Sequence, residues 1–183
     1  MTFPTSCTAF AGAQRIASGA PVAVAAAIRR HMDSHPEAAV LIFDDDTAQP
    51  VEFDLRGSEH DVTARLGGEP QRGRGRPKLG VVAREVTLLP RHWEWLAAQS
   101  GGASVALRKL VDAARAANVG KDRKRAAQTA VHRFMTAMAG NLTSYEDALR
   151  ALYAGDRARF ETMTASWPAD IRAHTMHFAA DAL

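Results

Sequence analysis

Residues 71–80, QRGRGRPKLG, combine the side chains that bind phosphate with a backbone that can approach a ligand closely. The run contains three glycines, no Asp or Glu, and the cations Arg72, Arg74, Arg76 and Lys78. Clustered cations raise the local electrostatic potential and attract polyanions. The run therefore predicts contacts with phosphate groups. A solvated linker, or an arm that pairs with acidic residues of the same chain, is the alternative interpretation.

The charge of the whole chain is distributed unevenly. Residues 1–70 carry a net charge of −5, residues 71–135 a net charge of +10, and residues 136–183 a net charge of −2. Such asymmetry is typical of a surface that meets nucleic acid. The acidic first third is equally the candidate partner for an intramolecular arm.

Other residues that could do chemistry are better explained as structure. Asp44, Asp45 and Asp46 offer hard oxygen ligands, but consecutive strand residues point to opposite faces, so we expect a turn. His174 and His177 can share a helical face, but no third ligand follows at metal-site spacing, so we expect packing or surface roles. Cys7 is the only cysteine and is predicted to be a small buried strand residue.

The sequence contains no recognisable nucleophile or phosphate-loop motif. We therefore predict no catalytic residue, no metal and no cofactor. Whether the chain is an enzyme stays open, and a protein without enzymatic activity is favoured.

The first third of the chain is predicted to fold as a small α+β unit. Residues 8–16 have the character of a strand, and Pro21 suits the start of a helix that ends near His35 and Pro36. Two further strands, AAVLIF at 38–43 and VEFDL at 51–55, are predicted to form a hairpin. Val51, Phe53 and Leu55 then share one face.

The middle of the chain predicts one strand and two helices. Pro90 limits the strand to Arg84–Leu89 and starts a helix near Arg91, which Gly101 and Gly102 end. Ser104 can cap the second helix. A lone strand must pair with another, either in a second copy of the chain or in the amino-terminal sheet.

The last third predicts helices at 121–140, 145–155 and 156–167, and a closing segment from Pro168. The expected fold class is α+β, with a small amino-terminal hairpin unit, a central strand-helix-helix and a helical carboxy-terminal part. The predicted segments are 1–66, a basic arm at 67–80, 81–118 and 119–183.

Residues 84–117 resemble the ribbon-helix-helix DNA-binding proteins. The resemblance implies a strand at Arg84–Leu89 that pairs in a dimer and a second helix that meets phosphate at residues 103–105, near Ser104. With Leu89 in the core, however, Val86 and Leu88 face outward with Arg84, and apolar side chains cannot hydrogen-bond a base edge. The opposite register presents Glu85 and Thr87, and the glutamate repels phosphate.

Residues 74–78, Arg-Gly-Arg-Pro-Lys, resemble the core of an AT-hook, which lies in the minor groove of A·T-rich DNA. Pro77 extends the preceding backbone, and a narrow groove attracts arginine. The predicted nucleic-acid-binding residues are Arg72, Arg74, Arg76, Lys78, Arg84, Arg91, Ser104, Arg108 and Lys109.

Residues 75–115, from GRPKLGVVAREV to LVDAAR, are similar to an uncharacterised bacterial family, a domain of unknown function. The similarity extends through FDDDTAQPVEFDLRG and WPADIR. It implies no activity.

The leading hypothesis is a dimeric DNA-binding regulator in the cytoplasm. The chain has no apolar run of the ~20 residues needed to cross a bilayer, so no membrane partner is expected. One alternative is a binding protein or enzyme for a small phosphorylated ligand, in which Arg84, Arg91 or His92 would converge with carboxylates. The other is a protein-interaction module, although we expect both Trp93 and Trp95 to be buried within the monomer.

Overall fold

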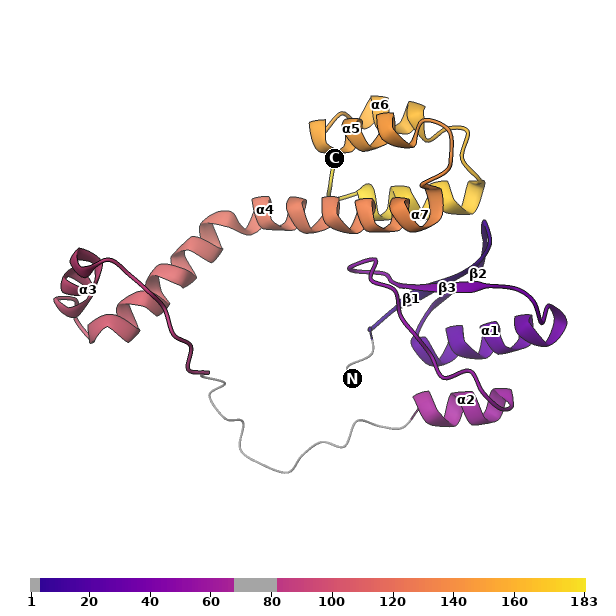
Figure 1. Ribbon diagram of the computed structural model, residues 1–183, viewed down its shortest axis with the longest axis horizontal. Helices are drawn as coiled ribbons and strands as arrows, with labels where there is room; N and C mark the ends of the chain where they lie inside the picture. Colours follow the sequence, from indigo (N-terminus) through magenta and orange to yellow (C-terminus); the bar gives the residue numbers. More distant parts are fainter. Residues whose placement is uncertain (1–3, 68–81) are drawn as a thin grey trace. The chain divides into compact units, whose positions relative to one another are not determined.

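The computed structural model describes residues 4–67 and 82–183 (Figure 1). The chain divides into two compact units. Met1–Gly68 and Asp122–Leu183 form one, which we call the main unit, and Glu69–Lys121 form the other, the middle unit. The predicted segments 1–66 and 119–183 thus belong to one unit, because side chains from both fill the same hydrophobic core. The predicted α+β class is confirmed.

The sheet of the main unit has three antiparallel strands in the order β2-β1-β3. These are β1 (Cys7–Ala11), β2 (Gln14–Gly19) and β3 (Val40–Asp44). The single strand expected at 8–16 is instead a hairpin. Gly12, with φ +55, makes the turn between its two strands.

Both faces of this sheet are covered, as Figure 1 shows. One face, with Cys7, Ala9 and Ile42, packs on Val24 and Ile28 of α1 (Pro21–Ser34). The other face, with Phe10 and Phe43, packs on the carboxy-terminal helices. The alternation of side chains along each strand produces this division. Helix α1 begins and ends where the sequence predicted.

The predicted hairpin between residues 38–43 and 51–55 is wrong in its second strand. Residues 51–55 form no strand, and the pairing consists of a bridge between Phe43 and Pro50 with bonds from Asp44 N to Gln49 O and from Val51 N to Ile42 O. Pro50 lacks an N–H donor, which weakens the ladder where it would begin. Val51, Phe53 and Leu55 nevertheless pack together against the α1 side of the core, as their alternation predicted.

Helix α2 (Glu59–Leu66) was not expected. Its start carries a sequence signal, because Ser58 and Asp61 form a capping box in which each side chain bonds the backbone N–H of the other. The Ser-x-x-Asp spacing is the pattern that could have predicted this helix.

Helices α5 (Tyr145–Ala154), α6 (Arg157–Met163) and α7 (Ala169–Ala179) agree with the prediction. Gly155, at φ +70, separates α5 from α6, and Asp156 caps α6 by accepting from Arg159 N. Buried aromatic rings of this part, Phe134, Phe160 and Phe178, meet Phe10 and Phe43 of the sheet in one cluster.

In the middle unit, α3 (Pro90–Ala97) begins at the predicted proline. Helix α4 (Gly102–Ala139) follows as one continuous helix of 38 residues. The predicted separate helices near 104–117 and 121–140 are therefore wrong. Gly120 is the only breaker between them, and a glycine costs a helix about 1 kcal/mol, which is less than a break requires. Ser104 lies inside the first turn and does not cap it.

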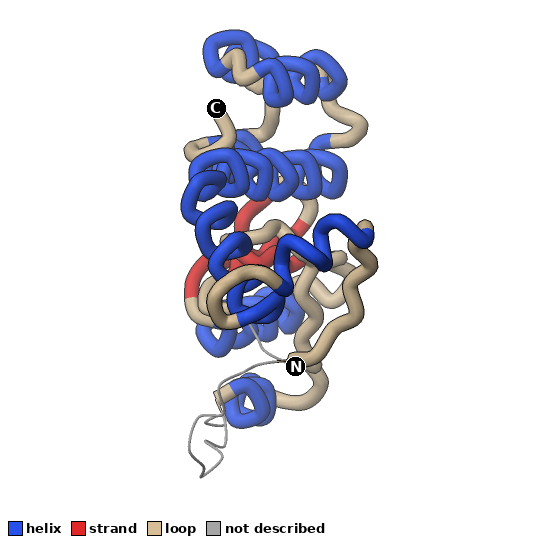
Figure 2. The backbone as a smooth tube through the Cα atoms, turned by 90° about the vertical axis from the view of Figure 1, so that its left-hand side faces the viewer, coloured by secondary structure: helices blue, strands red, loops and turns tan. Residues whose placement is uncertain are grey.

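Residues 82–89 form no strand, which corrects the strand predicted at Arg84–Leu89. Figure 2 draws them as a loop, and the sheet contains only β1, β2 and β3. Leu89 is nonetheless extended, at φ −67 and ψ 150. A strand is defined by its partner, and this segment has none among the described residues.

Cys7 should be inert in the folded protein. Its side chain is fully buried, and burial, followed by the charges of Asp45 and Asp44, raises the pKa of the thiol from 9.0 to about 11. A shift of this size lowers the thiolate fraction near neutral pH about 100-fold. We expect no reaction with a disulfide reagent at neutral pH and complete reaction in denaturant. Rapid labelling of the native protein would contradict the buried position of β1.

Candidate functional site

The predicted nucleic-acid-binding residues fall into two groups. Arg72, Arg74, Arg76 and Lys78 lie outside the described residues. The others belong to the middle unit and all have exposed side chains: Arg84 before α3, Arg91 in the first turn of α3, and Ser104, Arg108 and Lys109 near the start of α4. One contact links two of them, a bond of 3.1 Å from Arg108 Nε to Ser104 O.

The cations of the middle unit have no carboxylate partner within the described part of the chain. This set comprises Arg84, Arg91, Arg108, Lys109, Arg115 and Lys121. The main unit differs, because most of its arginines lie beside acids. Its ion pairs are Arg29–Asp33, Arg30–Glu59, Arg56–Asp54, Arg65–Asp54, Arg123–Asp181, Arg125–Asp122, Arg150–Asp147, Arg157–Glu161 and Arg159–Asp147. Positive charge without a local counter-charge is thus concentrated in the middle unit.

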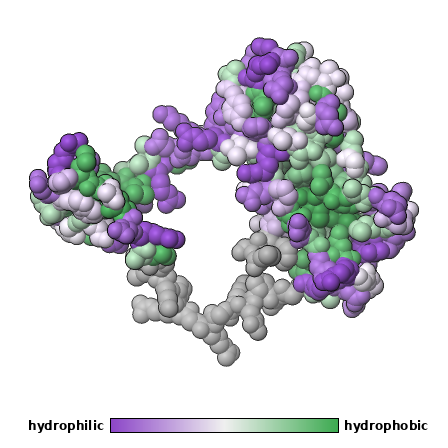
Figure 3. Space-filling model, viewed as in Figure 1, coloured by the Kyte–Doolittle hydropathy of each residue, from purple (hydrophilic) through white to green (hydrophobic). Residues whose placement is uncertain are grey.

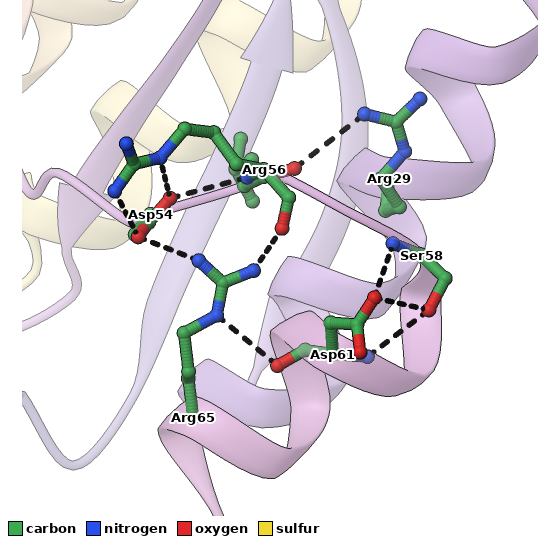
Figure 4. Close-up of polar contacts among 7 residues, drawn as sticks. Arg29, Asp54, Arg56, Ser58, Asp61 and Arg65 are labelled. Atoms are coloured by element: carbon green, nitrogen blue, oxygen red, sulfur yellow. Dashed lines mark hydrogen bonds and ion pairs between the residues drawn. The ribbon is translucent and has the colours of Figure 1, made fainter.

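Several acidic residues of the first third have local partners, as Figure 4 shows around Asp54. The Asp54 carboxylate lies 2.8 Å from Arg56 Nη2 and 2.5 Å from Arg65 Nη1. Hydrogen bonds from Arg56 and then Arg65 hold the pKa of Asp54 well below its usual range. Asp61 accepts from the backbone and hydroxyl of Ser58 at 2.8 and 2.7 Å. These contacts are exposed and add little stability, but the two arginines offset the charge of Asp54 locally.

The middle unit exposes large apolar side chains, which Figure 3 shows over α3. The exposed fraction is 41% for Trp93 and 53% for Trp95, so the expectation that both tryptophans are buried in the monomer is wrong. One short helix, the first part of α4 and an extended segment do not enclose the two indole rings. The set of exposed apolar residues is Val82, Val86, Leu89, Trp93, Trp95, Leu110, Val111 and Val119.

An apolar cavity of about 280 Å³ opens within this unit. Its lining residues are Leu88, His92, Trp95, Leu96, Leu107 and Leu110. A protein that binds a phosphorylated ligand was expected to place His92 beside carboxylates. In the structure, leucines and a tryptophan surround His92 instead. We call the lining and the exposed residues beside it, Val86 and Leu89, the apolar face.

Asp44, Asp45 and Asp46 form the expected turn. Asp44 Oδ1 accepts from the backbone N–H groups of Asp46 and Thr47 at 2.8 and 2.9 Å. Among the described residues no group of three metal-binding side chains is close enough to hold an ion. The side chain of Asp45 turns inward, which the sequence did not indicate.

Asp45 leads to a polar site that sequence spacing could not have found. It accepts from Ser6 Oγ at 2.5 Å and from Thr8 Oγ1 at 2.6 Å, and its Oδ1 lies 3.8 Å from Nε2 of His174, 129 positions later in the chain. His174 is buried, as a packing role requires, against the rings of Phe10, Phe134 and Phe178. Burial lowers the pKa of His174 to about 4, although the Asp45 charge opposes the shift.

No helix among the described residues is long and apolar enough to cross a membrane. Comparison with known proteins gives one finding. A family model described as an uncharacterized protein conserved in bacteria (DUF2239) matches residues 6–179, which is most of the chain. No curated protein and no solved structure matches.

Proposed function

Since the chain belongs to the bacterial family DUF2239, whose description names no activity, its function must be inferred from its own residues, and we propose a dimeric DNA-binding regulator. The middle unit, together with the basic arm, would contact DNA. The main unit would assemble or control the protein. Such a protein would act in the cytoplasm.

One observation carries the proposal: among the described residues, positive charge without a carboxylate partner is concentrated in the middle unit. Arg84, Arg91, Arg108 and Lys109 are exposed and lack carboxylate partners in the described residues, whereas the main unit pairs most of its arginines with acids. Cations without a counter-charge on the protein can neutralise DNA phosphates and release the counterions condensed on them, and this release supplies a large share of DNA affinity. The pairing of Asp54 with Arg56 and Arg65 also makes this carboxylate a poorer partner for the arm.

The apolar face supports the second part of the proposal, a homodimer. Only Leu96 and Ala106 are buried among the described residues of the middle unit. A segment with so small a core gains little from folding alone. A second copy would cover Trp95 and Leu110 and give residues 84–89 a strand partner. Pairing between copies is the arrangement in which that segment would become the predicted ribbon.

A titration of the protein with A·T-rich and G·C-rich duplexes at two salt concentrations tests the proposal. We expect binding to both duplexes that weakens steeply with salt, with a slope of about −0.9 per phosphate contact on a log-log plot. Absence of binding at ~50 mM salt would rule out a DNA-binding function, since electrostatic contacts are strongest there.

Removal of the cations of the basic arm tests whether the arm binds in the minor groove of DNA. Replacing Arg72, Arg74, Arg76 and Lys78 together by glutamine should abolish any preference for A·T-rich DNA, because these cations are the part of the chain that resembles a minor-groove hook. The same variant should flatten the salt dependence of binding to both duplexes. Competition titrations with the two duplexes measure both effects. An unchanged A·T preference would assign groove reading to the middle unit instead.

A further inference from the structure

His174 carries a buried nitrogen without a hydrogen-bond partner. Its side chain is 5% exposed, and Nε2 is the only buried side-chain nitrogen or oxygen among the described residues that lacks a partner. An unsatisfied buried polar atom costs about 1–3 kcal/mol, so native structures rarely keep one without a reason. The polar site around Asp45 and His174 belongs wholly to the main unit and is separate from the proposed DNA surface.

The proton of His174 can be assigned from its surroundings. The low pKa leaves the imidazole neutral at pH 7, with one N–H. Asp45 Oδ1 faces Nε2 at 3.8 Å. A proton on Nδ1 would set the lone pair of Nε2 against the carboxylate, so the proton belongs on Nε2. Yet 3.8 Å is too long for a hydrogen bond, and the donor stays unused.

Asp45, beside the Nε2–H donor of His174, can accept further hydrogen bonds. Each of its oxygens accepts one hydroxyl, from Ser6 or Thr8, and a carboxylate oxygen can accept another bond. A group beside the line from Nε2 to Oδ1 could accept from the imidazole and donate to the carboxylate. A hydroxyl can do both. Asp45 is 14% exposed, and a hydroxyl that reached Nε2 would have to displace the Asp45 side chain.

The cavity beside these two residues has room for a small molecule. Its volume is about 440 Å³, and it is lined by Ser6, Arg15, Ser18, Asp45, Asp46, Ala173, His174 and His177. Cavities of this size hold small ligands. Ser18 Oγ lies 2.8 Å from Thr8 Oγ1, which connects it to the Asp45 hydroxyl network. Arg15 and His177 supply further polar groups at the edge.

The lining also discriminates between ligand charges. Asp45 and Asp46 outweigh Arg15, so these charged side chains of the lining sum to −1 and repel phosphate. A cation is attracted by the carboxylates but cannot accept a bond from Nε2. We propose that this cavity binds a neutral polyhydroxy compound of monosaccharide size, one hydroxyl of which bridges Nε2 of His174 and Oδ1 of Asp45.

The ¹⁵N signals of the His174 ring test the proposal in the full-length protein. The probes are D-glucose, D-ribose and myo-inositol, each titrated to millimolar concentration, with inorganic phosphate and magnesium chloride as ionic comparisons. We expect at least one polyol to shift these signals saturably, and neither ionic probe to do so. Asp45→Asn should weaken the binding about tenfold or more, the effect of losing a hydrogen bond to a charged group.

Two histidine variants test whether binding requires the imidazole of His174. His174→Phe fills the same aromatic surroundings without Nε2 and should abolish the binding, which calorimetry measures. His132→Phe removes a histidine outside the cavity and should leave the affinity unchanged. The proposal is overturned if none of the three polyols shifts the wild-type signals, if phosphate or magnesium saturates the site, or if both histidine variants bind equally. These results are independent of DNA binding.

Discussion

Replacing Arg84, Arg91, Arg108 and Lys109 together by glutamine should remove most of the salt dependence of DNA binding. If four of the eight cations that the dimer loses each make one phosphate contact, the slope of log affinity against log salt becomes shallower by about 3.6. Between ~50 and ~200 mM salt the wild type would then lose about 150-fold more affinity than the variant. Fluorescence anisotropy with a labelled duplex measures both curves.

A matched control separates this effect from a loss of total charge. The variant Arg30, Arg56, Arg65 and Arg150→Gln removes the same number of cations from the main unit, where each lies beside a carboxylate. Its slope should equal that of the wild type. If both variants change the slope equally, net charge governs the binding and the middle unit is not a specific surface.

The second large effect should come from charge on the apolar face. Trp95→Glu with Leu110→Glu places two carboxylates in the lining of the apolar cavity. Burial of a large apolar side chain contributes about 1.5–3 kcal/mol, so losing two should weaken a dimer by at least about 100-fold. Sedimentation velocity should show the wild type as a dimer and the variant as a monomer. The DNA affinity of the double variant should also fall, because a monomer presents half of the dimer's contacts to DNA.

Leu41→Glu is the control for this pair. Leu41 lies in β3 of the main unit and is 47% exposed, so it is another large apolar surface residue that receives a charge. The Leu41→Glu variant should remain a dimer. Circular dichroism should show equal helix content in all three proteins, since the replaced side chains are exposed or border a cavity. A monomeric wild type, or a double variant that remains a dimer, would contradict the assigned interface.

Local signals in the sequence predicted much of the fold. Pro21 and Pro90 start helices, and Gly155 separates two, because each restricts or frees the backbone whatever surrounds it. Helix α4 was predicted as two helices, yet the one glycine between them, Gly120, does not overcome the cooperativity of a long helix. The segment 84–89 has the residues of a strand but has no strand partner in the described part of the chain, and sequence periodicity carries no information about partners.

Of the two candidate sites, the sequence predicted one and missed the other. Composition predicted the cationic segment because charge clusters along the chain. It did not predict Asp45 beside His174, since their contact depends on how β3 and α7 pack across the Phe10 and Phe134 core. The pattern of Asp44–Asp46 was correctly interpreted as a turn. That turn also aims one carboxylate at a buried imidazole, which only the tertiary structure reveals.

The most direct test of the central proposal is sedimentation of a labelled A·T-rich duplex with excess protein in ~50 mM salt, where electrostatic binding is strongest. We predict that the duplex sediments in a complex whose mass includes two protein chains, and that added salt releases it. A duplex that sediments at its own rate, alongside a protein with the mass of one chain, would contradict both DNA binding and the dimer.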